Sequence, residues 1–339
     1  MRVFVCEFLT GGGLAGRPAP AGLSREGDIM LRALAAELAE IEGIDVVVPR
    51  GQRFTDPGLD VELCWIDPAR DPWPTWRELI AQCDAAWPIA PESGGALAAL
   101  TELILTSGRV LMGSGLEAVR LTTSKQATAA HLETAGIAVV PTFALIPALT
   151  SGALPDSVDG WVVKPDDGAG AEETWLLRTP SALARWTRAR PDRARFIVQP
   201  YVPGTAASLS LLCRRGRVTL LACNEQDVRI EGGDCFRYRG GVVGGAEARR
   251  AHYEPIAARI AMAIPDLWGY VGVDLIDGAD GPCVLEVNAR LTTSYVGLRD
   301  ALGINTAALV VDWLEQQGAT AMVPRPLRER AIRVDGHAA

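Results

Sequence analysis

Residues 272–288 constrain the fold more than any other stretch, because the two strands that they predict can be aligned from the sequence alone. Two apolar runs flank a cluster of glycine, aspartate and proline, which is typical of an antiparallel hairpin. With the turn centred on Asp280, Asp274 lies opposite Glu286 and shares its face. Asn288 falls on the same face, because side chains two apart on a strand point the same way. The other face is predicted to be apolar, with Leu275 opposite Leu285 beside Val273 and Val287.

The polar face of this hairpin predicts a metal site. Two carboxylates opposite each other repel unless a cation lies between them. Asp274, Glu286 and Asn288 together offer the oxygen donors that suit Mg²⁺, which also takes nucleotide phosphates and water as ligands. A solvated polar face is the alternative, but it does not explain why this face carries acceptors alone before Arg290.

The first 115 residues alternate between strand and helix patterns. Strands separated by helices indicate a parallel sheet with crossover helices, and ligands bind such sheets beyond the carboxyl ends of the strands. Two glycine-rich loops, at 10–13 and 91–95, follow predicted strands and occupy such places. The predicted elements are strands at 1–8, 44–48, 85–89 and 110–112, and helices at 29–41 and up to Leu105.

From about residue 116 the pattern changes to short strands with fewer helices, which indicates an α+β arrangement. We divide the chain into an N-terminal α/β domain (1–115), two α+β subdomains (116–203 and 204–325) and a tail (326–339). The predicted helices lie at 124–135, 181–189, 253–263 and 306–316, and the strands at 139–145, 160–164, 174–177, 196–199, 208–213, 218–224, 270–276 and 283–288.

The chain uses arginine almost everywhere but keeps two lysines, Lys125 and Lys164, among its 33 basic residues. Lys164 ends a predicted strand beside the small-residue loop 165–171, where an ammonium and loop amides can reach a phosphate. Lys125 begins a predicted helix, where a cation opposes the helix dipole unless it reaches an anion. Each alone also fits an ordinary surface lysine, and chance retention explains the count equally well.

Residues 199–204 form an apolar strand end that two prolines and a glycine make irregular. Such backbone leaves N–H and C=O groups free to read an adenine edge. A plain interdomain linker fits the same residues.

Composition excludes several classes of protein. The net charge of −8 without a basic block argues against binding to nucleic acid or to an anionic membrane, and no apolar stretch reaches the length of a membrane span. The seven cysteines contain no CxxC pair, which suits a reducing cytoplasm, our expected location. The sequence also lacks GxxxxGK[ST], GxGxxG and GxSxG motifs.

The order of these features resembles the ATP-grasp superfamily of carboxylate–amine ligases over roughly residues 1–320. The resemblance implies an α/β, or α+β, fold in which an N-terminal parallel-sheet pre-ATP-grasp domain precedes two subdomains that clamp ATP. It implies catalytic roles for Arg290 and Lys164 and Mg²⁺ (commonly two ions, with Mn²⁺ as an option) on Asp274, Glu286 and Asn288. The implied ATP-binding residues are Lys125, Lys164, Gly168, Ala169, Gly170, Gln199, Pro200, Tyr201 and Val202.

The segment from Glu286 to Gly297 is similar to the tyramine–glutamate ligases of methanofuran-type cofactor biosynthesis, as are residues 7–13 and 91–94. Ser124 and Ala289 depart from that pattern. The resemblance implies that ATP activates glutamate as an acyl phosphate, which tyramine or a tyrosine-like amine then attacks, with release of ADP and phosphate. Candidate substrate residues are Glu7, Gly11, Gly12, Arg237, Arg239, Ser294 and Tyr295.

Three alternatives stay open. One is a glutamate ligase acting on a pterin or another small metabolite, one is an ATP-grasp kinase, and one is a nucleotide-binding module without catalysis. The acceptor amine, the glutamate carboxyl that reacts, the number of residues added and the oligomeric state, including a homodimer, are left undecided by the sequence.

Overall fold

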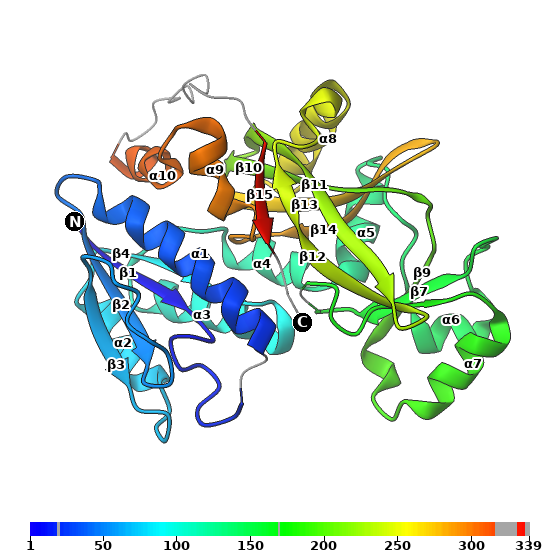
Figure 1. The fold of residues 1–339 in the computed structure, drawn as a ribbon, viewed down its shortest axis with the longest axis horizontal. Helices are drawn as coiled ribbons and strands as arrows, with labels where there is room; N and C mark the ends of the chain where they lie inside the picture. The colour runs from blue at the N-terminus through cyan, green and yellow to red at the C-terminus, as the bar shows by residue number, and fades with distance from the viewer. Residues whose placement is uncertain (19–20, 169, 316–330, 336–339) are drawn as a thin grey trace.

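The computed structural model describes residues 1–18, 21–168, 170–315 and 331–335 and contains two sheets (Figure 1). In the N-terminal sheet the order is β3-β2-β1-β4-β5, and every neighbouring pair is parallel, as predicted. The central strand β1 and its neighbour β4 are almost wholly buried, as both faces of the sheet are covered. The elements are β1 (Arg2–Glu7), α1 (Ala21–Ala39), β2 (Asp45–Gly51), β3 (Glu62–Ile66), α2 (Trp73–Ala81), β4 (Ala85–Ile89), a 3₁₀ turn (Ser93–Gly95), α3 (Ala96–Thr106) and β5 (Val110–Leu111).

Two elements of this domain were not predicted, β3 and α2, because they lie in a stretch rich in proline and tryptophan. Pro74 falls in the first turn of α2, where a missing N–H costs nothing. The side chains of Trp76 and Ile80 are fully buried and hold α2 against the sheet. Tertiary burial therefore makes a helix of a segment whose composition indicates a loop.

Within the described residues the second sheet has ten strands, in the order β14-β13-β10-β11-β12-β8-β7-β9-β6, with β15 paired to β12. A single residue pair, Cys235 with Trp175, joins β12 to β8. It connects a small half, which we call the lid half (β6–β9 with α6 and α7), to a large half built on long antiparallel strands. The elements are α4 (Leu116–Thr123), α5 (Lys125–Thr134), β6 (Phe143–Ala144), α6 (Leu145–Ser151), β7 (Trp161–Pro165), β8 (Trp175–Leu177), α7 (Pro180–Ala189), β9 (Phe196–Pro200), β10 (Gly204–Arg214), β11 (Arg217–Glu231), β12 (Cys235–Val243), α8 (Arg250–Ala263), β13 (Gly269–Gly278), β14 (Gly281–Asn288), α9 (Tyr295–Leu302), α10 (Thr306–Glu315) and β15 (Ile332–Asp335), with 3₁₀ turns at Arg193–Arg195 and Glu247–Arg249.

The lid half has a small core of its own, in which Val163, Phe196 and Val198 pack under α6 and α7. The predicted strand at 139–145 is wrong for most of its length, since β6 covers two residues and α6 begins at Leu145. Leu145 is fully buried in this core, so packing favours the helix there.

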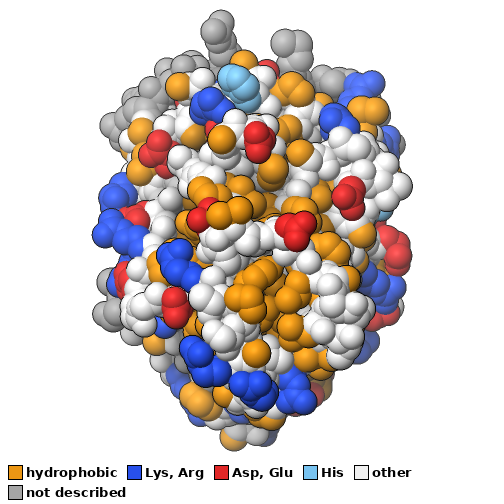
Figure 2. All heavy atoms as spheres, turned by 90° about the vertical axis from the view of Figure 1, so that its right-hand side faces the viewer, with side chains coloured by type: hydrophobic (Ala, Val, Ile, Leu, Met, Phe, Trp, Pro, Cys, Tyr) orange, Lys and Arg blue, Asp and Glu red, His pale blue; other side chains and the backbone are white. Residues whose placement is uncertain are grey.

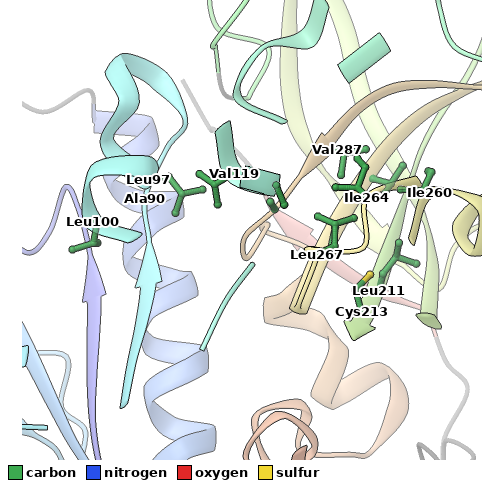
Figure 3. Close-up of a cluster of buried hydrophobic side chains, with 14 of the residues drawn as sticks. Ala90, Leu97, Leu100, Val119, Leu211, Cys213, Ile260, Ile264, Leu267 and Val287 are labelled. Atoms are coloured by element: carbon green, nitrogen blue, oxygen red, sulfur yellow. The ribbon is translucent and has the colours of Figure 1, made fainter. Parts of the chain in front are cut away.

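A larger core runs from the N-terminal domain into the large half (Figure 3). Ala90 and Leu97 of the first domain lie beside Val119 of α4, and the cluster continues to Leu267 and Val287 of the large half. Burial of this apolar area holds the ends of the N-terminal strands next to the hairpin.

The C-terminal segment treated above as a tail contains ordered structure. Ile332–Asp335 form β15, and Val334 pairs with Gly241 of β12. Val334 is buried and packs over Gly297 of α9, where a Cβ would meet both Val243 and Val334 at 2.9 Å. Residues 326–330 and 336–339 lie outside the described residues.

Over the described ranges, none of the helices combines the length and apolar character needed to cross a bilayer. The face that includes the lid half carries acidic and basic side chains interspersed with apolar ones (Figure 2). All seven cysteines are free thiols.

Candidate active site

The register of the β13–β14 hairpin places the predicted acidic face as expected. Asp274 pairs with Glu286, and Gly272 pairs with Asn288. Beyond Asp274 the register shifts by one residue, so Leu275 pairs with Val284 and the predicted partner, Leu285, is wrong. The bulge leaves Val284 in the apolar core and turns Leu285 to the wall of a cleft.

The two carboxylates of this face carry opposite pKa shifts. Burial and the neighbouring Glu286 raise the pKa of Asp274 to about 8. Burial alone would also raise the pKa of Glu286, but Lys125 and Lys164 outweigh it and hold that pKa low, at about 2. Asp274 accepts hydrogen bonds from Gln226 Nε2 at 2.9 Å and from Asn288 Nδ2 at 3.1 Å. The face therefore keeps negative charge where a cation can bind.

The donor set fits Mg²⁺. Over the described ranges, no three or more His, Cys, Asp or Glu side chains are grouped so that they could hold a metal ion. Asp274, Glu286 and the amide oxygen of Asn288 are three oxygen donors in a cleft, which leaves other positions for phosphate oxygens and water, as Mg²⁺ prefers. Two carboxylates that face each other in register, beside an amide oxygen, are the chemical observation that fits such an ion.

The two lysines converge on this carboxylate pair from separate elements. Lys125 begins α5, and its Nζ lies 3.1 Å from Glu286 Oε2 and contacts the carbonyl of Gly168. Lys164 lies on β7. Burial lowers its pKa to about 8, although the negative charge of Glu286 raises it. The Lys125 cation at a helix start, unfavourable by itself, is thus matched by an anion 161 residues away.

These groups line one cleft of about 250 Å³ between the lid half, the large half and the N-terminal domain. Gln199 is buried and donates to Thr142 Oγ1 at 2.8 Å. The N–H of Tyr201 donates to Gly160 O at 2.9 Å. The adenine contacts expected of the Tyr201 and Val202 backbone stay a prediction. The predicted residues that line the cleft are Glu7, Lys125, Lys164, Gly168, Gly170, Gln199, Pro200, Tyr201, Val202, Asp274, Glu286, Asn288, Arg290 and Ser294.

The N-terminal domain closes one side of the cleft with carboxylates. Glu92, in the loop after β4, holds Arg290 by two hydrogen bonds, of 2.8 Å from Nε and 2.7 Å from Nη2. Glu7 accepts from the N–H of Thr10 at 2.7 Å, and burial raises its pKa to about 7. Glu26 of α1 also lines the cleft, and burial raises its pKa to about 7 although Arg290 lowers it. Strand ends of a parallel sheet thus face the site, as expected.

Five predicted substrate residues lie outside this cleft, and each has a physical reason. Gly11 and Gly12 shape the turn after β1, where Gly12 has φ +96° and a Cβ on Gly11 would lie 2.7 Å from the Glu7 carbonyl. Tyr295 is buried and donates to Glu37 Oε2 at 2.6 Å. The other two are arginines of β12. Arg239 pairs with Glu231 at 2.7 Å, and the side chain of Arg237 is exposed to solvent. Ala169 lies outside the described residues.

Sequence reasoning missed three polar groups of the site: Glu92, Glu26 and Gln226. Glu92 lies in a loop noted for its glycines, and its partner is 198 residues away, so no local signal exists. Gln226 lies on β11 beyond the predicted strand end at 224, because β11 continues to Glu231. Glu26 precedes the predicted helix start at 29, whereas α1 begins at Ala21.

Comparisons with known families match most of the chain. Residues 122–294 match the model described as ATP-grasp domain, and residues 44–119 match the model described as pre ATP-grasp 3 domain. The boundary between the two matches falls at α4, where the parallel-sheet domain ends.

Two curated relatives are similar over part of their length. One is a tyramine–L-glutamate ligase of Methanocaldococcus jannaschii, 31% identical over 104 residues, which are 31% of this chain and 32% of the relative. The other, of Xanthomonas axonopodis pv. citri, is named probable alpha-L-glutamate ligase and is 36% identical over 160 residues, 46% of this chain and 51% of the relative. The chain therefore spans about a third to a half of the length of these relatives.

A solved structure supports the fold. A protein from Archaeoglobus fulgidus, assigned to the ATP-grasp superfamily, superposes with a TM-score of 0.71 at 23% identity over 92% of this chain and 88% of that chain. At this identity the likeness concerns the fold, and the chemistry rests on the cleft itself.

Proposed function

The chain belongs to the ATP-grasp family, and on that premise we propose that it is an ATP-dependent ligase that joins a glutamate carboxylate to an amine. One observation supports this most: both lysines of the chain, two facing carboxylates and Arg290 meet in a single cleft. Phosphoryl transfer depends on positioning and charge neutralisation, and this set of residues supplies both.

In the proposed reaction, a carboxylate oxygen of glutamate attacks the γ-phosphorus of ATP, and ADP leaves. The neutral amine nitrogen then attacks the acyl carbon and gives up a proton, and the bond from that carbon to the phosphate oxygen breaks, so that phosphate leaves with the proton. Asp274, Glu286 and Asn288 would hold Mg²⁺, which neutralises phosphate charge when bound. Lys125 and Lys164 face the phosphates, and Arg290 stabilises the charge of the acyl phosphate.

We propose tyramine or a tyrosine-like amine as the acceptor, in methanofuran-type cofactor biosynthesis and in the cytoplasm. The N-terminal side of the cleft suits such a molecule, because apolar side chains lie next to carboxylates there. Leu9, Met30 and Ile89 offer an apolar wall to a ring, and Glu26 offers a carboxylate to an ammonium group. Both curated relatives are named as glutamate ligases, which supports glutamate as the carboxylate substrate.

The test is phosphate release by the purified chain with Mg·ATP and glutamate, with and without tyramine or tyrosine, followed by mass spectrometry. The proposal expects phosphate and a glutamyl amide only when both substrates are present. An alcohol phosphorylated without free phosphate would identify a kinase instead. Mg²⁺-dependent ATP binding without an amide would redirect the search to pterins and other acceptors.

A further inference from the structure

The side chain of Arg290 is held in the cleft by a residue of another domain. Glu92 accepts two hydrogen bonds from the guanidinium, the bidentate arrangement that fixes the plane of an arginine. The side chains of Arg290 and Glu92 are 11% and 6% exposed, so the pair lies almost out of water. A third bond, from Nη1 to the Leu291 carbonyl at 2.9 Å, completes the restraint.

The loop that carries Glu92 is bonded to the loop that follows β7. Asp167, in the loop after β7, accepts the N–H of Gly94 at 3.0 Å through its carboxylate. Its carbonyl accepts the Ser93 hydroxyl at 3.0 Å. Gly94 and Gly95 have φ of +64° and +73°, the left-handed backbone that lets this loop turn sharply. The loop that carries Glu92 is thus bonded both to Arg290 and to a residue three positions after Lys164.

We propose that Glu92 is the positioning residue for Arg290 and that Asp167 supports it through the loop 91–95. The inference rests on the proposed function, in which Arg290 faces the acyl phosphate. An arginine that must stabilise developing charge gains from a fixed orientation, because the reorganisation is then complete before the reaction. Removing the partner of a buried, hydrogen-bonded charge leaves the other charge uncompensated. Glu92 therefore affects turnover through Arg290 and does not contact the nucleotide.

The first experiment compares Glu92→Gln with wild type in phosphate release and in ATP binding. We expect kcat to fall about 10- to 100-fold, while the Kd for Mg·ATP stays within about threefold. Glu37→Gln is the matched control, because Glu37 is also a buried carboxylate that bonds across domains, to Tyr295, but lies outside the cleft. We expect that variant to keep its kcat.

Asp167→Ala tests the second link. We expect a smaller loss of kcat, about three- to tenfold, because the loop 91–95 keeps its glycine turn and one contact is lost. The effect of Asp167→Ala should vanish in the Glu92→Gln background, since both changes act through one path. Additive losses would overturn the role of Asp167.

A second measurement tests the geometry without relying on activity. In Arg290→Ala, free guanidinium at low millimolar concentration should occupy the vacated space against Glu92 and raise the Tm. If the enzyme is active, it should also restore several-fold of the lost kcat. In the Arg290→Ala, Glu92→Gln double variant both effects should disappear.

The outcomes separate the two ideas. Wild-type protein that makes no amide would overturn the proposed function, and the guanidinium shift would still support or refute the positioning of Arg290. Glu92→Gln with wild-type kcat in an active enzyme would overturn the inference alone. So would a guanidinium shift that persists without Glu92.

Discussion

The cleft and the contact between α1 and α9–α10 both bury carboxylates, but the groups around these carboxylates differ in charge. In the second region, which we call the latch, Glu37 accepts from Tyr295 Oη at 2.6 Å and from the N–H of Ala307 at 3.0 Å. Burial raises its pKa and these bonds lower it. The cleft instead places Asp274 against Glu286 with cations beside them. A carboxylate held by neutral donors indicates a structural role, whereas facing carboxylates with converging cations indicate a ligand.

The change with the largest expected effect is Glu286→Gln, which removes a charge from the cleft. We expect turnover to fall by about 10³-fold, roughly 4 kcal/mol, because an electrostatic contact in a desolvated site is lost. The measurement is phosphate release under saturating Mg·ATP. Glu225→Gln, an exposed acid on β11 of the same sheet, is the control. Full activity of Glu286→Gln would contradict the assignment of the cleft.

The pH dependence of stability should be next in size, through Glu7. Its pKa is about 7 in the folded chain and 4.5 ordinarily, so folding favours the protonated form. The stabilisation is complete below about pH 4.5 and is lost as pH rises through 7, a change of about 3 kcal/mol at most. Urea unfolding should therefore show that the stability of Glu7→Gln relative to wild type is higher at pH 8 than at pH 5.

Glu117→Gln, an exposed acid, corrects that experiment for the general loss of one negative charge. Parallel pH curves for Glu7→Gln and wild type would show that Glu7 is ionised without cost, and the contrast between cleft and latch would weaken.

Gly27→Ala tests how tightly the cleft wall is packed. A Cβ on Gly27 would lie 2.4 Å from the Glu7 carboxyl carbon, so α1 must shift. We expect a loss of about 2 kcal/mol in the free energy of unfolding, although alanine is normally the better helix former. In a Glu7→Ala background the space opens and the loss should disappear. A stabilised Gly27→Ala single variant would contradict this packing.

The smallest expected effect belongs to the latch. Tyr295→Phe removes the hydroxyl that Glu37 accepts, and we expect about 1 kcal/mol lower stability because Glu37 keeps the Ala307 bond. Thermal unfolding gives the size, and KM values for glutamate and amine should not change. A raised KM with unchanged Tm would return Tyr295 to the substrate site.

The prediction succeeded where side chains alternate along one local segment. The pairing of Asp274 with Glu286 follows from a period of two and a turn, and the parallel sheet follows from strands that alternate with helices. The lysines were found because lysine is rare in this chain. Lys125 lies 3.1 Å from Glu286, and Lys164 lines the same cleft, so a count of one residue type can pick out side chains that lie together.

It failed where long-range packing decides. Leu275 pairs with Val284 because a bulge, which no pattern shows, turns Leu285 to the cleft. Tyr295 follows β14 in sequence, yet its ring lies away from the cleft and its hydroxyl donates to Glu37 of α1.

Spacing within a few residues, or composition, was therefore enough to predict the alternating sheet, the acidic hairpin and the two lysines. The tertiary structure alone decided that Glu92 holds Arg290, that Asp167 supports its loop and that Tyr295 belongs to the latch. These contacts join residues far apart in the chain, and burial of a common core brings them together. The partner of a buried charge depends on which element the core places beside it, and no local sequence pattern predicts that element.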